Sequence, residues 1–157
     1  MNDEDFLRQA IELGTRSARE GGGPFGALVV RAGTVIATGN NQVVSIPDPT
    51  AHAEVVALRV AARALGAFLL DGCVVYASCE PCPMCLAAAF WARVERVVYA
   101  ASRYDAAAAG FDDDALYQEM AAADGRGERS LPVVRLLPEA GIAPFEAWAA
   151  NPNRVPY

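Results

Sequence analysis

Pro81-Cys82-Pro83-Met84-Cys85 is the stretch that decides how this sequence folds and what it binds. Cys82 and Cys85 are three positions apart at the expected start of a helix, so their sulfur atoms lie on one face. Pro83 suits a first helical turn, where its missing N–H costs nothing. The unpaired N–H groups and the positive dipole end of that turn favour thiolates over thiols. The stretch therefore predicts two sulfur ligands for a metal ion.

His52 is the one histidine of the 157 residues, and it lies in Thr50-Ala51-His52-Ala53-Glu54. With Thr50 as an N-cap, His52 also lies in the first turn of a helix. Two helix starts that face one metal ion supply an imidazole nitrogen and two thiolates, a ligand set that suits Zn²⁺. We therefore expect His52, Cys82 and Cys85 to bind zinc, with the fourth position left for water.

Glu54 follows His52 by two residues, a spacing that points the two side chains apart along a helix. Both reach one small site only if that site lies near the helix end, where the cysteine turn places the metal. Glu54 then moves protons instead of binding zinc, and it is the predicted catalytic residue. The pattern H-x-E…P-C-x-x-C is one described for zinc deaminases.

Cys79 allows a second interpretation of the same residues. As a fourth ligand it would close the site into a structural Cys₃His zinc-binding module without catalysis, and the Cys-x-x-Cys pair alone would also suit redox chemistry. Against the closed site, Cys79 is expected to end a strand and to point away from the helix turn. A closed site also leaves Glu54 without a task.

Composition excludes several other functions. All 13 basic residues are arginine, so Schiff-base catalysis and a phosphate-loop lysine are excluded. The net charge is −6, and residues 101–157 hold nine acids against five arginines, which argues against a nucleic-acid partner. The sequence also lacks a bilayer-length apolar run and a signal-peptide pattern, so no membrane partner and a cytoplasmic location are expected.

Alternating strand and helix patterns predict an α/β fold in a single domain over residues 1–157. We expect helices on both faces of a sheet, with parallel pairing after an opening hairpin. Five of the ten prolines lie between Pro132 and Pro156, so the tail is expected to form an arm over residues 125–157. The expected helices are 3–20, 50–65, 82–92, 113–123 and one around Phe145 and Trp148; the expected strands are 25–31, 35–40, 73–77, 94–100 and 133–136.

The metal motif, extended through Ser78-Cys79-Glu80-Pro81, resembles the cytidine deaminase superfamily. Similarity to the guanine deaminase branch of this superfamily covers nearly the whole chain. It rests on longer stretches of similar sequence and not on one short, well-defined motif. It includes Gly22-Gly23-Pro24-Phe25-Gly26, Asp48-Pro49-Thr50, Trp91-Ala92-Arg93, the stretch from Asp105 to Asp113, and the final Tyr157.

The resemblance implies a three-layer α/β/α sandwich around a five-stranded mixed sheet. It also implies a homodimer whose subunits exchange C-terminal segments, and zinc-dependent deamination of guanine to xanthine and ammonia. Glu54 would shuttle protons, and His52, Cys82 and Cys85 would bind zinc. The implied substrate contacts are Asn41, Phe25, Ala53, Trp91, Asp113 and Tyr157.

Some alternatives stay open at this point. Asn41 on its own could be a turn residue, and Phe25 and Trp91 could be core aromatics. A tRNA adenosine deaminase shares the metal motif, but its polyanionic substrate suits the acidic tail poorly. Cytosine, guanosine or a related aminated ring is harder to exclude as the substrate in place of guanine, because the size of the pocket cannot be determined from the sequence.

Overall fold

A computed structural model describes residues 1–111, 113–122 and 131–156 of the chain. Its described helices and strands follow the predicted order, except that the short helices α4 and η1 were not expected and the expected strand 133–136 does not form. The elements are α1 (Asp3–Arg19), β1 (Gly26–Arg31), β2 (Thr34–Asn40), α2 (Ala53–Leu65), β3 (Cys73–Cys79), α3 (Pro83–Trp91), β4 (Arg96–Ala101), α4 (Arg103–Ala108), α5 (Asp113–Ala122), η1 (Ala140–Ile142) and α6 (Ala143–Ala150).

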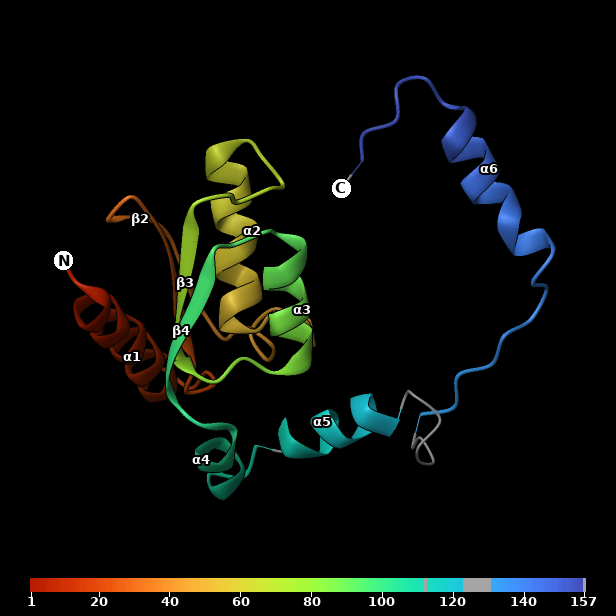
Figure 1. Cartoon of the computed structure of the whole chain (residues 1–157). Helices are drawn as coiled ribbons and strands as arrows, with labels where there is room; N and C mark the ends of the chain where they lie inside the picture. The colour runs from red at the N-terminus through yellow and green to blue at the C-terminus, as the bar shows by residue number, and fades with distance from the viewer. Residues whose placement is uncertain (112, 123–130, 157) are drawn as a thin grey trace.

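The described strands form one sheet in the order β2-β1-β3-β4, with α1 on one face and α2 and α3 on the other (Figure 1). Alternate residues of β1 serve the two faces, because successive side chains of a strand point in opposite directions. Leu28 and Val30 pack with Phe6 of α1, whereas Ala27 and Val29 join the core under α2. The three-layer α/β/α arrangement agrees with the expectation.

Two details of the predicted sheet are wrong. The sheet has four strands among the described residues, not five, because Val133–Leu136 forms no strand there. The side chains of Val133–Leu136 are exposed, and no described strand lies beside this segment to pair with it. The pairing after the hairpin is also not uniformly parallel: β3 pairs with β4 in parallel but with β1 antiparallel. The reason is that β1 lies between β2 and β3, which run in the same direction.

The start of α2 also differs from the expectation. His52, not Thr50, is the N-cap residue, and the helix begins at Ala53. The Asp48 carboxylate accepts hydrogen bonds from the backbone N–H and the hydroxyl of Thr50. Thr50 is therefore held in the preceding loop, and His52 occupies the N-cap position of α2.

Gly39 of β2 allows α2 to approach the sheet closely. A Cβ at this position would lie 2.2 Å from the carbonyl oxygen of Ala53 and 2.7 Å from the backbone nitrogen of Ala57. Both atoms belong to the α2 backbone, which cannot give way as a flexible side chain can. The absence of a side chain at Gly39 thus permits the close packing of α2, whose N-cap is His52 and whose first turn contains Glu54.

A three-residue network ties α1 to the far strands of the sheet. Arg96 of β4 donates two hydrogen bonds to the Asp3 carboxylate, at 2.7 and 2.9 Å, and the Tyr76 hydroxyl donates a third at 2.6 Å. The Arg96 bonds first, and then the Tyr76 bond, lower the pKa of Asp3 to about 2. The carboxylate therefore stays charged in the folded protein at pH values where it is protonated in the unfolded chain.

This network predicts a pH-dependent contribution to stability. Because the folded-state pKa of Asp3 is depressed, its contribution is fully present above about pH 3.8 and is lost as the pH falls toward 2. Asp3→Asn is expected to lower the urea midpoint at pH 6, with the difference from wild type shrinking between pH 4 and pH 2. Equal midpoints at pH 6, or a constant difference down to pH 2, would contradict this account.

Candidate metal and active site

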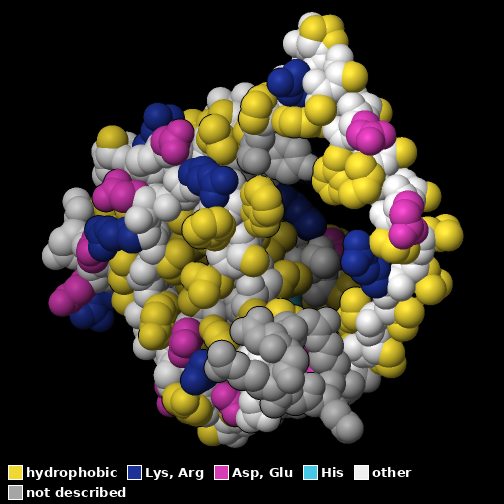
Figure 2. Space-filling view, turned by 45° about the vertical axis from the view of Figure 1, so that its right-hand side comes forward, with side chains coloured by type: hydrophobic (Ala, Val, Ile, Leu, Met, Phe, Trp, Pro, Cys, Tyr) yellow, Lys and Arg dark blue, Asp and Glu magenta, His cyan; other side chains and the backbone are white. Residues whose placement is uncertain are grey.

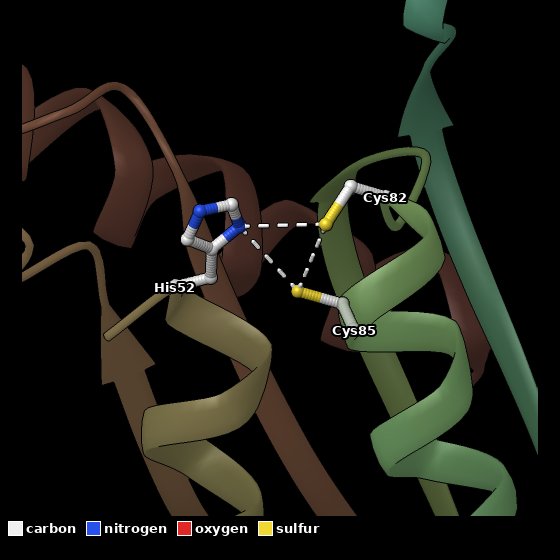
Figure 3. Close-up of side chains that lie close together, drawn as sticks. All are labelled: His52, Cys82 and Cys85. Atoms are coloured by element: carbon white, nitrogen blue, oxygen red, sulfur yellow. Dashed lines mark hydrogen bonds between the residues drawn. The ribbon is translucent and has the colours of Figure 1, made fainter. Parts of the chain in front are cut away.

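Two helix N-termini meet at the candidate site. His52 is the N-cap of α2 and Cys82 is the N-cap of α3, both in extended backbone conformation. Neither side chain makes the usual capping hydrogen bond, so imidazole and thiol point across the gap between the helices (Figure 3). Pro83 occupies the start of α3, and Cys85 follows on the same face. The predicted pairing of two helix starts is confirmed.

The three donor atoms have the spacing that a tetrahedral zinc site requires. The two sulfurs are 3.6 Å apart, and the His52 Nδ1 atom lies 3.6 Å from the Cys82 sulfur and 3.5 Å from the Cys85 sulfur. Tetrahedral zinc with ordinary bond lengths separates two sulfur ligands by about 3.8 Å and a sulfur from a nitrogen by about 3.6 Å. The residues present therefore fit zinc, and Nδ1 is the nitrogen that faces it.

Cys79 is not part of this cluster. Its sulfur lies 3.7 Å from the carbonyl oxygen of Ser102, at the end of β3. Among the described residues, the potential metal-binding group consists of His52, Cys82 and Cys85. Three protein donors leave one tetrahedral corner for a water molecule or substrate, which is the arrangement of catalytic and not of structural zinc sites.

The short distance between the Cys82 and Cys85 sulfurs shifts the pKa values of both thiols in opposite directions. The hydrogen bond shared between the sulfurs, and then that with His52, lower the pKa of Cys82 to about 4 against the opposing effect of burial. The same hydrogen bond and burial raise the pKa of Cys85. A metal ion binds thiolates, so zinc binding at this pair would be coupled to proton release.

Glu54 lies beside the donor triangle, within α2. Its side chain is 8% exposed, and its Oε2 atom lies 3.5 Å from the Cys85 sulfur. Burial raises the pKa of this carboxyl group above its ordinary value. A buried carboxyl group with a raised pKa can both accept and return a proton near neutral pH.

A hollow of about 270 Å³ opens onto the donor triangle. Phe25 and Asn41, both expected as substrate contacts, line it together with His52, Glu54 and Cys82. The lining residues that the sequence analysis did not single out are Gly23, Val43, Val44, Glu80 and Phe111.

Phe111 and Asn41 show how the walls of the hollow are built. Phe111 meets Phe25 edge to face, with ring centroids 4.9 Å apart. The side-chain oxygen of Asn41 accepts a hydrogen bond from the Val43 backbone N–H, so the residue does hold a turn, and its amide still lines the hollow. The resulting wall is apolar on one side and polar at one edge, which suits a flat heterocycle.

The other expected substrate contacts lie elsewhere or beyond what the structure describes. Ala53 is buried at the first residue of α2. Trp91 ends α3 and lines a separate apolar hollow of about 740 Å³ together with Val155 of the tail. Asp113 begins α5, although its side chain lies outside the described part of the structure, as does the whole of Tyr157.

Comparisons with known proteins agree with this site. Residues 1–101 match the family model for the cytidine and deoxycytidylate deaminase zinc-binding region. A guanine deaminase of Bacillus subtilis is 48% identical over the full length of both chains. A tRNA-specific adenosine deaminase of Aquifex aeolicus is 40% identical, but over 64% of this chain and 67% of its own.

Solved structures give the same result. The crystal structure of guanine deaminase from Bacillus subtilis superposes with a TM-score of 0.93 at 46% identity, covering 100% of this chain and 99% of that one. A guanine deaminase from Nitrosomonas europaea has a TM-score of 0.65 at 36% identity, over 69% of this chain and 63% of its own. The chain therefore belongs to the zinc-binding cytidine and deoxycytidylate deaminase family and, within it, to the guanine deaminases.

Proposed function

We propose that this protein is a zinc-dependent hydrolase that converts guanine and water to xanthine and ammonia. The observation that carries the proposal is a buried carboxyl group beside one nitrogen and two sulfur donors, at the base of a hollow of purine size. The full-length similarity to a guanine deaminase selects guanine among aminated rings.

His52, Cys82 and Cys85 would hold the zinc ion. Bound there, zinc supplies a Lewis acid that lowers the pKa of a water molecule toward neutrality. Glu54 accepts a proton from the attacking water and delivers it to N3 of guanine as the C2–O bond forms. It then takes the proton of the new C2 hydroxyl group and passes it to the amino group, so that ammonia leaves as the C2–N bond breaks and the C2 carbonyl forms. One carboxyl group serves first as base and then as acid.

The walls of the hollow would position the ring. Phe25 and Phe111 offer aromatic surface to the purine, and the Asn41 amide can donate to a carbonyl or ring nitrogen at its edge. Ala53, Trp91, Asp113 and Tyr157 complete the proposed set of substrate contacts. Trp91 lines a separate hollow in its own chain, so we propose that its substrate contact comes from a second subunit.

Ammonia release from the zinc-loaded protein tests the proposed function. Guanine, guanosine, cytosine and adenine are compared side by side at equal concentration. We expect guanine to be turned over fastest, with xanthine formed in equal amount to ammonia. Faster release from cytosine or guanosine would replace the proposed substrate, and no release from any of the four would overturn the assignment as a deaminase.

We further propose one deaminase domain over residues 1–157, with 125–157 as an arm exchanged between two copies in a homodimer. Described apolar side chains of the arm are exposed, and Figure 2 shows open space between part of the arm and the body of the chain. Apolar side chains are also exposed on α3, where Phe90 and Trp91 are 72% and 57% accessible. Surface of this kind is typical of subunit interfaces. The exposed arm residues are Leu131, Val133, Val134, Leu136, Leu137, Ile142, Phe145, Trp148 and Val155.

Trp148→Glu tests the proposed dimer. If Trp148 is buried against a second copy, the added charge is expected to raise the dimer dissociation constant by at least about 30-fold. Analytical ultracentrifugation over a concentration series gives that constant. Ile11→Glu, at an exposed apolar position of α1, is the matched control and should change it little. A wild-type monomer, or equal constants for the two variants, would contradict the proposal.

No helix in the described part of the chain is long and apolar enough to cross a membrane. A purine partner in place of a nucleic acid is consistent with the net charge of −6. We propose a cytoplasmic location for the protein.

A further inference from the structure

The segment formed by α4 and α5 contributes one wall of the hollow, but few of its described apolar side chains are buried against the rest of the protein. Phe111 lies between the two helices and lines the hollow against Phe25. Ala106 is the buried hydrophobic side chain of this segment among the described residues, and Leu116 packs partly buried against Cys82 and Cys85. Apolar burial of this extent leaves the position of the segment dependent on polar contacts.

Two hydrogen bonds join this segment to the turn immediately before Cys82, and Arg103 links α4 to α5 within the segment. The Glu80 carboxylate accepts a hydrogen bond from the Arg103 backbone N–H at 3.0 Å, and the Pro81 carbonyl accepts one from the Tyr117 hydroxyl at 2.8 Å. Burial raises the pKa of Tyr117, so its hydroxyl keeps the proton that it donates. The Arg103 guanidinium stacks 4.4 Å from the Tyr117 ring centroid, and its Nε atom lies 3.7 Å from the Asp114 carboxylate.

We propose that Arg103 and Tyr117 form a latch that holds α5 against the Glu80-Pro81 turn and thereby sets the affinity of the hollow for its purine. Both are positioning residues, because neither lines the hollow and both act through Phe111 and the start of α5. The latch rests on the proposed function for its substrate. It fixes the wall that faces Phe25 relative to Cys82, which directly follows the same turn.

Tyr117→Phe removes one hydrogen bond and keeps the ring under Arg103. Loss of a single neutral hydrogen bond is expected to raise KM for guanine about two- to tenfold, with kcat within twofold of wild type and full zinc content. Arg103→Met removes the stacked charge but keeps the backbone N–H that Glu80 accepts. It should raise KM similarly, and Arg103→Lys should fall between Met and wild type, because lysine keeps the charge without the planar stack.

A double variant and a backbone measurement distinguish the latch from general loss of structure. If the two side chains act as one unit, Tyr117→Phe with Arg103→Met should raise KM by clearly less than the product of the single effects. Amide hydrogen exchange of residues 113–122 should speed up in each variant, while exchange in α2 stays unchanged. Arg8→Met, a solvent-exposed arginine of α1, is the matched control.

Several results would overturn the latch. They are an unchanged KM in both single variants, a fall in kcat without a change in KM, or equal exchange of the α5 amides in variants and wild type. Failure of the proposed function is separate, since wild-type protein would then release no ammonia from guanine. The exchange measurement still decides whether the two side chains hold α5, even in that case.

Discussion

Glu54→Gln is expected to bind one zinc ion per chain and to turn over guanine at least about 10³-fold more slowly than wild type. The loss is large because the carboxyl group is proposed to act twice, first as a base toward water and then as an acid toward the leaving amine. Glutamine has the same shape and reaches the same position, but it cannot exchange a proton. Glu54→Ala should lose activity to the same extent.

The folded state should tolerate the Glu54→Gln change. Burial raises the pKa of Glu54, which means that the charged form is costly in this environment. A neutral amide removes that cost, so the melting temperature should equal or exceed that of wild type. Turnover by steady-state kinetics and zinc by atomic absorption check the prediction, with Glu12→Gln on α1 as the control. Retention of a tenth or more of wild-type activity would remove Glu54 from the mechanism.

Cys82→Ala and Cys79→Ala are expected to behave in opposite ways. Cys82 supplies one of three donor atoms, so its loss should weaken zinc binding by more than about 100-fold and abolish turnover. The Cys82 side chain makes no capping hydrogen bond, so the substitution should cost α3 little beyond the metal. Cys79 lies against the Ser102 carbonyl instead of the donor triangle, and Cys79→Ala should keep stoichiometric zinc and activity.

The two cysteine variants together separate a catalytic site from a structural one. Zinc content after dialysis against a weak chelator, measured alongside turnover, gives the comparison directly. A closed four-ligand site predicts that Cys79→Ala sheds zinc as readily as Cys82→Ala. Loss of zinc from both variants would therefore contradict the three-ligand arrangement, and loss from neither would place the metal elsewhere.

The sequence predicts those parts of the site that depend on local structure. Helix starts follow from short-range patterns, and proline after Cys82 indicates where α3 begins. The meeting of His52 with Cys82 could be inferred because the chain has one histidine, and because Cys82 and Cys85 have the spacing that places two sulfurs on one helix face. The exact cap of α2 was wrong because Asp48 binds Thr50, a contact that depends on the loop conformation.

Features that depend on long-range contacts were harder to predict. Phe111 faces Phe25 across a separation of many residues, and nothing in either local pattern indicates the contact. Val133–Leu136 has the composition of a strand, but a strand exists only where another strand pairs with it. β1 pairs antiparallel with β2 in the hairpin and also with β3, and the order of helices and strands along the chain does not reveal that β3 lies beside β1.

X-ray absorption at the zinc edge of the loaded, substrate-free protein tests the central claim most directly. The account predicts two sulfur neighbours at about 2.3 Å and two nitrogen or oxygen neighbours at about 2.0–2.1 Å, namely the His52 imidazole and one exchangeable water. The spectrum of Cys79→Ala should be identical to that of wild type. Three sulfur neighbours in the wild-type protein, with one lost in Cys79→Ala, would contradict an open catalytic site.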